Sequence, residues 1–286
     1  FRYMLYGTFA FDYHRPEINE HLLFQNIGLI TTRQTKEYFS ILCTSLPTGQ
    51  HKLATPYDGS YVSPLYLYPE DQSGKEKQRT FQITEDWQPG KEGRIPNLDK
   101  AFIEELSGRI NMAFVSDGRG DLKKTFGPED VLDYIYGVFH SPRYRQKYAE
   151  FLKIDFPRVP WPEDKSRFID VSKVGGRLVK LHLMESEVLE DEKLQPKFPI
   201  EGDMAVAKGY PKYELGKIFI NPKQYFVEVP EEVWRFRIGG YQVCEKWLKD
   251  RRERKLNYED IQHYKKVCVA LAETIRSMQD DRLNIF

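Results

Sequence analysis

The feature that most limits the fold of this chain is a regular apolar seam near its C-terminus. Apolar residues recur there at alternating spacings of three and four, at Ile261, Tyr264, Cys268, Leu271, Ile275 and Met278. Because this spacing keeps the side chains on one face of a helix, it predicts a helix of about 22 residues, roughly 33 Å long. A shorter seam precedes it at Tyr241, Cys244 and Leu248, and Asn257 is a candidate N-cap between the two. The two segments predict an antiparallel helix pair, either as ordinary core packing or as a rigid spacer between domains.

The rest of the chain alternates between strand-like and helix-like stretches. Strand-forming β-branched and aromatic residues are concentrated at residues 27–32, 38–44 and 65–68. Helix starts are predicted at Asn97 or Asp99, Pro128, Ser141 and Lys173. The polar stretch 70–94 is expected to be a surface loop or linker.

These patterns predict an α+β fold. A mixed β-sheet is expected in the N-terminal part, followed by a helical middle and the C-terminal antiparallel helix pair. We expect three parts: a mainly β part at residues 1–95, a helical and small β part at 96–230, and the helical spacer at 231–286.

Charge and cysteine content limit the classes of function that are open to the chain. Its 43 Lys and Arg residues balance 43 Asp and Glu residues, which argues against a free-standing basic nucleic-acid binder but allows a local basic face. The three cysteines form no CxxC pair, so a zinc site or disulfide framework is not expected and a reducing cytoplasm fits. No apolar run approaches membrane-spanning length, so no membrane partner is expected. The chain opens on Phe1 rather than Met, and we expect a fragment of a longer protein.

Catalytic motifs are missing from the sequence, so we expect no catalytic residue, metal ligand or cofactor in this chain. Asn221-Pro222-Lys223 resembles the Asn-Pro-Pro-aromatic motif of amino-methyltransferases, but it lacks the second Pro and the aromatic residue, which indicates a turn. Asp117 and Asp121 with Lys123 partly resemble a nuclease site, in which clustered carboxylates and a lysine bind a metal ion and activate water. A stand-alone metal-dependent nuclease and a helical protein-interaction module therefore stay open as alternatives.

Basic and polar side chains suited to double-stranded DNA gather in three places. The candidate DNA-binding residues are Arg33, Gln34 and Lys36, then Arg119, Lys123 and Lys124, with Arg235 and Arg237 as weaker candidates. Arg can pair with guanine edges and Gln with adenine edges, whereas Lys holds phosphates. Ordinary solvated connections are the alternative interpretation of each cluster. The acidic run at residues 185–192 would repel phosphate, so the DNA face should lie elsewhere.

Several stretches together resemble a known family. The most similar stretch is residues 229–242, which read VPEEVWRFRIGGYQ, and further likeness lies in residues 133–145, 151–162, 26–29 and 64–69. The chain resembles the C-terminal target-recognition, or specificity, domain of single-polypeptide type I restriction–modification enzymes and related adenine-specific DNA methyltransferases. It departs from the family pattern at residues 2–7, where an Arg-Pro-Phe-Asp-like stretch is usual.

The resemblance implies a division of labour within a larger polypeptide. An upstream methyltransferase domain would bind S-adenosylmethionine and flip an adenine for N6 methylation, as part of a bacterial defence system. This chain would grip double-stranded DNA and read its sequence, with phosphate contacts setting the register and base-edge contacts selecting the site.

Overall fold

The computed structural model describes residues 16–36, 38–48, 59–68 and 93–284. The chain divides into two compact units, one formed by Phe1–Val179 with Asp281–Phe286 and the other by Lys180–Asp280. The boundaries expected at residues 95 and 230 remain predictions, because compactness alone does not establish which parts fold independently.

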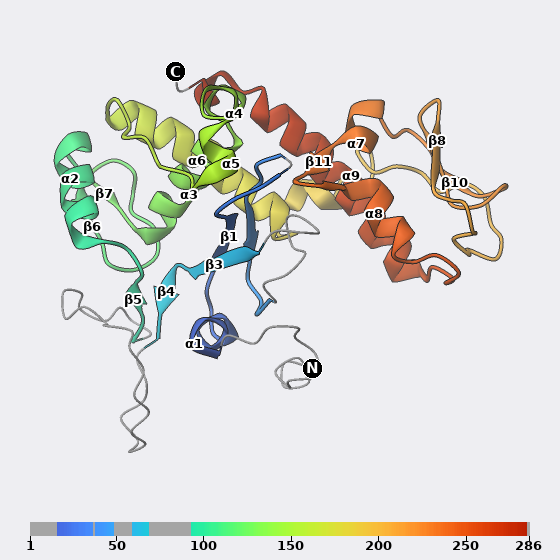
Figure 1. The fold of residues 1–286 in the computed structure, drawn as a ribbon, viewed down its shortest axis with the longest axis horizontal. Coiled ribbons are helices and arrows are strands. Elements are labelled where there is room, and N and C mark those ends of the chain that lie inside the picture. The colour runs from blue at the N-terminus through green and yellow to red at the C-terminus, as the bar shows by residue number, and fades with distance from the viewer. Residues whose placement is uncertain (1–15, 37, 49–58, 69–92, 285–286) are drawn as a thin grey trace, which may run out of the picture. The chain divides into compact units, whose positions relative to one another are not determined.

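A three-stranded antiparallel sheet forms the N-terminal part of the first unit (Figure 1). It consists of β1 (Gly28–Thr32), β2 (Leu42–Thr44) and β3 (Ser60–Pro64), in the order β2-β1-β3. Alternate residues of β1 point inward, and Ile30 packs against Val62 and against Leu22 of the preceding 3-10 turn η1 (Glu20–Leu23). The strand predicted at 27–32 is confirmed, whereas only the end of the one predicted at 38–44 is a strand. Short helix α1 (Pro16–Asn19) precedes η1.

Tyr66 begins the short strand β4 (Tyr66–Leu67), which pairs with β5 (Ile95–Pro96). Residues 70–92 of the predicted loop lie outside the described residues. The chain then enters α2 (Lys100–Ile110), whose N-cap is Asp99, since its carboxylate accepts from the N–H of Phe102 at 2.8 Å. Strands β6 (Ala113–Phe114) and β7 (Thr125–Phe126) pair in parallel across the next loop.

Helix α3 (Pro128–His140) begins at the predicted proline and is buried along most of its length. The single helix predicted after Ser141 is instead two short ones, α4 (Pro142–Lys147) and α5 (Phe151–Ile154). Helix α6 (Lys165–His182) begins eight residues earlier than the predicted Lys173. The prediction missed Asp164, whose carboxylate accepts from the N–H of Arg167 at 2.8 Å and so caps the helix. The 3-10 turn η3 (Asp281–Leu283) belongs to this unit.

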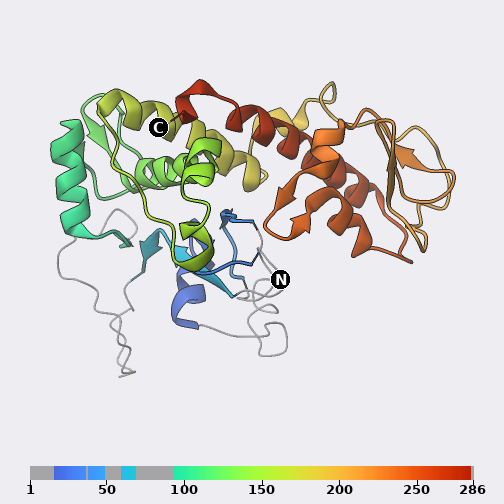
Figure 2. The ribbon, with the colours of Figure 1, turned by 45° about the horizontal axis from the view of Figure 1, so that its top comes forward.

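The second unit combines small sheets with helices (Figure 2). It contains the 3-10 turn η2 (Glu187–Glu190) and two sheets, whose strands are β8 (Lys212–Glu214), β9 (Lys217–Phe219) and β10 (Tyr225–Phe226), then β11 (Arg237–Ile238) and β12 (Tyr241–Gln242). Its helices are α7 (Glu231–Arg235), α8 (Val243–Lys249) and α9 (Tyr258–Met278). Residues of β8, β9, β10, α7, α8 and α9 share one hydrophobic core.

The predicted C-terminal helix pair is confirmed by α8 and α9, which contact each other. Asn257 caps α9, because its side chain accepts from the N–H of Asp260 at 2.7 Å. Cys244 and Leu248 of α8 share a core with Leu271 and Ile275 of α9. The expected α+β class is likewise confirmed.

Candidate nucleic-acid interface

The segment after β1 carries three of the candidate residues. We call residues 33–36 the β1 loop. It lies against the end of α5: the N–H of Thr35 donates to the carbonyl oxygen of Lys153 at 3.2 Å, and the amide of Gln34 donates to that of Ile154 at 3.5 Å. A main-chain hydrogen bond therefore anchors the loop while most of its side chains face solvent.

Arg33 in this loop lies beside a weak partner. Its Nε is 3.8 Å from Oδ1 of Asp155, and the two side chains are 58% and 45% exposed. An ion pair in such a wet setting contributes about 0–1 kcal/mol. Lys36 is exposed as well. Both cations can therefore turn toward an anion at little cost.

Apolar side chains border the β1 loop. The rings of Tyr61 on β3 and Phe156 meet edge to face with centroids 5.0 Å apart. Ile154, whose carbonyl receives Gln34, has 65% of its surface exposed. Sequence analysis did not single out these three residues, because residue 61 and residue 156 meet only in the folded chain.

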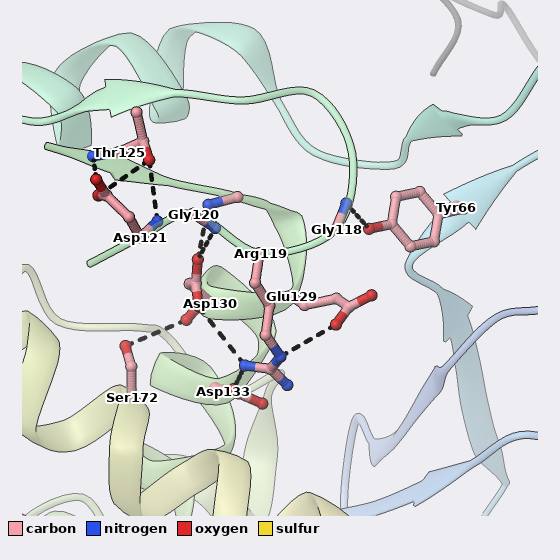
Figure 3. A network of polar contacts seen from close by, with 11 residues as sticks. Tyr66, Gly118, Arg119, Gly120, Asp121, Thr125, Glu129, Asp130, Asp133 and Ser172 are labelled. Atoms are coloured by element: carbon pink, nitrogen blue, oxygen red, sulfur yellow. Dashed lines mark hydrogen bonds and ion pairs between the residues drawn. The ribbon is translucent and has the colours of Figure 1, made fainter. Parts of the chain in front are cut away.

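The loop between β6 and β7 carries Arg119, Lys123 and Lys124 and is fixed by hydrogen bonds. Oδ1 of Asp121 accepts from the backbone N–H groups of Lys123, Lys124 and Thr125 at 2.7–2.8 Å. These bonds hold the pKa of the Asp121 carboxyl well below its usual range, and the bond from the N–H of Lys124 has the largest effect. Asp121 is thus a turn-forming residue. The backbone of the same loop is also held at Gly118, whose N–H donates to the hydroxyl of Tyr66 at 2.9 Å (Figure 3).

Arg119 does not extend into solvent, as a DNA-binding arginine would. Its guanidinium points into a group of carboxylates on α3 (Figure 3). Its Nε lies 3.1 Å from Glu129, its Nη1 lies 3.5 Å from Asp130, and it contacts Asp133 still more closely. Asp130 also accepts from the N–H of Gly120 at 2.7 Å. The guanidinium therefore joins the loop to α3, and its charge is offset by three acids.

The pKa of Asp133 is raised to about 6. Burial is the main cause, since its side chain is 1% exposed, and the neighbouring Asp130 and Glu129 add to it. One guanidinium cannot balance three carboxylates, so the pKa of Asp133 stays above its usual value despite the contact with Arg119. Its Oδ1 has no hydrogen-bond partner.

Lys123 and Lys124 stay on the surface of the same loop. Lys165, at the first turn of α6, donates from Nζ to the carbonyl oxygen of Lys123 at 2.5 Å. This adds a third cation, half-buried, to the pair. Sequence analysis did not single out Lys165, because the helix that carries it was predicted to begin later.

The two remaining candidates lie in the second unit. Arg235 is 73% exposed and pairs with Glu231 at 2.5 Å. It lines a shallow depression with Pro230, Glu231 and Glu232, where two carboxylates outweigh its single charge. Arg237 lies exposed on β11, opposite Gln242 of β12. This part of the surface offers less net positive charge to a phosphate than the loops of the first unit do.

The described residues hold no group of three or more His, Cys, Asp or Glu side chains able to bind a metal ion. The side chain of Asn221 accepts from the N–H groups of Lys223 and Gln224 and so closes a turn, as predicted. Within the described ranges, none of the helices is both long enough and apolar enough to cross a membrane.

Solved structures share this fold. They include the ATP-dependent Type ISP restriction-modification enzyme LlaBIII bound to DNA (TM-score 0.67, 19% identity, 95% of this chain and 17% of that chain). They also include a DrdV–DNA complex (TM-score 0.64, 18% identity, 93% of this chain and 25% of that chain). A third is a nuclease-deletion mutant of the Type ISP restriction-modification enzyme LlaGI in complex with a DNA substrate mimic (TM-score 0.58, 20% identity, 90% of this chain and 18% of that chain). The chain thus spans between 17% and 25% of the length of these proteins.

A search of curated proteins gave no match. The model of the Type ISP C-terminal specificity domain, in contrast, matches residues 1–280, which is nearly the whole chain. The resemblance inferred from the sequence is confirmed: the chain belongs to the Type ISP C-terminal specificity domain family.

Proposed function

We propose that this chain recognises a specific sequence in double-stranded DNA, as part of a restriction–modification or N6-adenine DNA methyltransferase polypeptide. The observation that carries the proposal is the β1 loop, where Arg33, Gln34 and Lys36 stand together on a main-chain anchor. This combination supplies donors for guanine and adenine edges and a cation for phosphate. The DNA complexes among the similar structures support the same function.

The rest of the polypeptide would supply the chemistry. The chain spans at most a quarter of the similar structures, which leaves room for an upstream methyltransferase domain that binds S-adenosylmethionine. We place the whole protein in the cytoplasm, where its DNA substrate would be found.

The candidate residues take different roles in this proposal. Arg33 and Gln34 read base edges, whereas Lys36, Lys123 and Lys124 contact phosphates. Arg119 holds its loop on α3 and contributes indirectly, since three carboxylates surround it. Arg235 and Arg237 remain weaker candidates for phosphate contacts.

The two alternatives have less support. A nuclease would need the carboxylate of Asp121 for a metal ion, but three backbone N–H groups engage it. A helical interaction module would need the apolar seam of α9 to face a partner, but Leu271 and Cys268 are buried in the core of their own unit.

The proposal is tested by selecting duplexes from a randomised pool with the full-length protein and then titrating the enriched duplex. Lys36→Ala should weaken binding to enriched and scrambled duplexes alike and lower the salt slope by about one. Arg33→Ala should cost roughly 1–3 kcal/mol on the enriched duplex alone. Lys193→Ala is the matched control, because Lys193 is an exposed lysine beside the acidic run at residues 185–192. A pool that enriches no sequence, or variants that bind like the control, would refute the proposal.

A further inference from the structure

Ile154, Phe156 and Tyr61 place apolar surface directly beside the base-reading side chains of the β1 loop. We propose that these three residues form a contact surface for the C5-methyl groups of thymine in the major groove. The inference rests on the proposed function and extends it from polar to apolar reading. In the major groove each A·T pair presents that methyl group, whereas the minor groove presents none.

The side chains of Ile154, Phe156 and Tyr61 are large and apolar, yet each leaves more than a third of its surface exposed. Ile154 is 65% exposed, and Phe156 and Tyr61 are 38% and 39% exposed. On β3, inward residues alternate with exposed ones, and Tyr61 occupies an exposed position where a polar residue is usual. Its edge-to-face contact with Phe156 fixes both rings without covering them.

The polar side chains of the β1 loop and the apolar side chains of residues 154–156 are held close together. Gln34 donates to the carbonyl oxygen of Ile154, and Arg33 lies beside Asp155, so the β1 loop and residues 154–156 form one surface. A Gln side chain pairs with the N6 and N7 atoms of adenine. The thymine opposite that adenine, or a thymine one step away, would then present its methyl group to Ile154 or Phe156.

The surrounding charge favours DNA over a protein as the partner. Four cationic side chains, Arg33, Lys36, Lys153 and Arg158, lie in the β1 loop and residues 150–158, against the two carboxylates of Glu150 and Asp155. Lys36, Lys153 and Arg158 are exposed. Cations around a small apolar surface suit a groove lined by phosphates.

The experiment replaces each thymine of the enriched duplex, one at a time, by deoxyuridine, which lacks the methyl group and keeps the base pair. With the wild-type full-length protein, affinity should fall about fourfold at one or two positions, since burying a methyl-sized group is worth roughly 0.8 kcal/mol. Ile154→Ala and Phe156→Ala should bind the thymine duplex more weakly and lose most of this discrimination.

Leu215→Ala is the matched control, because Leu215 is 91% exposed at the β8–β9 turn of the other unit. It should keep the full methyl effect. Thermal unfolding of each variant shows whether it is folded, and substitution of the exposed Ile154 should leave the melting temperature unchanged.

The outcomes separate this inference from the proposed function. Enrichment of a sequence without any deoxyuridine effect, or with an effect that persists in both variants, overturns the methyl contact and leaves DNA recognition standing. If the variants bind the thymine duplex normally but weaken the packing of this domain against the other domains of the full-length protein, the surface is a protein contact and not a DNA contact. A pool that enriches nothing overturns both.

Discussion

Gly175 of α6 packs so closely on Asp133 of α3 that the chain has no room for a side chain there: an added Cβ would overlap the carbonyl oxygen of Asp133. Gly137 on α3 meets α6 in the same way, because a Cβ added there would lie 2.7 Å from the carbonyl oxygen of Val171. The two helices therefore approach through glycine, and the carboxylate group around Arg119 is built on one of them.

Gly175→Ala should consequently lower the free energy of unfolding by more than about 2 kcal/mol, because the helices must separate to admit the methyl group. Gly108→Ala is the control, since Gly108 lies in α2 with open space around its Cα. That change should be neutral or raise stability by up to about 1 kcal/mol through helix propensity. Chemical denaturation measures both, and equal effects would contradict the close packing.

The raised pKa of Asp133 predicts a pH dependence of stability. Its pKa rises from 3.8 to about 6 in the folded chain, so the folded state binds the proton more tightly than the unfolded state. The resulting stabilisation is complete below about pH 4 and is lost as pH rises through about 6. Relative to Asp133→Asn, the wild type should lose about 2 kcal/mol between pH 4 and pH 7. A gap between the two proteins that widens in favour of wild type with rising pH would mean that the ion pair with Arg119 dominates instead.

Arg119→Ala should destabilise the first unit, because it leaves three neighbouring carboxylates without their cation. We expect a loss of about 2–3 kcal/mol, less than for a fully buried pair, since the Arg119 side chain is 39% exposed. Arg276→Ala removes an exposed arginine that pairs with Glu273 one helical turn away, and it should change stability by less than about 0.5 kcal/mol. Denaturation at neutral pH compares them, and a silent Arg119→Ala would show that the guanidinium does not hold the loop.

The core of the second unit makes a further prediction. Leu271 of α9 is 4% exposed in this core, so Leu271→Ala should cost about 2–4 kcal/mol. Leu215→Ala should cost almost nothing by the same denaturation measurement. A small effect at Leu271 would imply that the seam of α9 is not the structural contact it is inferred to be.

Local signals in the sequence predicted several elements well. β1, α2, α3 and α9 were found because each carries its own evidence, such as the cap at Asp99 or the apolar seam from Ile261. The start of α6 was not predicted, although the cap at Asp164 is an equally local signal. Residues 2–7, where the family pattern departs, lie outside the described residues.

The candidate interface was predicted only in part, for a physical reason. Composition and position pointed to Arg33, Gln34 and Lys36, but whether a cation is free depends on what the fold brings beside it. Arg119 has the same local appearance as a surface arginine, yet acids up to 14 residues away surround it. The meeting of Tyr61 with Phe156 depends on tertiary packing across the chain and leaves no periodic trace in the sequence.

The anchoring of the two loops has an evolutionary consequence. Thr35 is tied to Lys153 by main-chain atoms, and Asp121 holds the N–H groups of Lys123 and Lys124 rather than their side chains. Any residue other than proline can supply such an N–H. Side chains at positions 33, 36, 123 and 124 are thus free to vary while the loops keep their shape. Under the proposed function, a single substitution at position 33 can then change the base that is read, and substitutions at positions 36, 123 and 124 can change the hold on phosphate, without first rebuilding the scaffold.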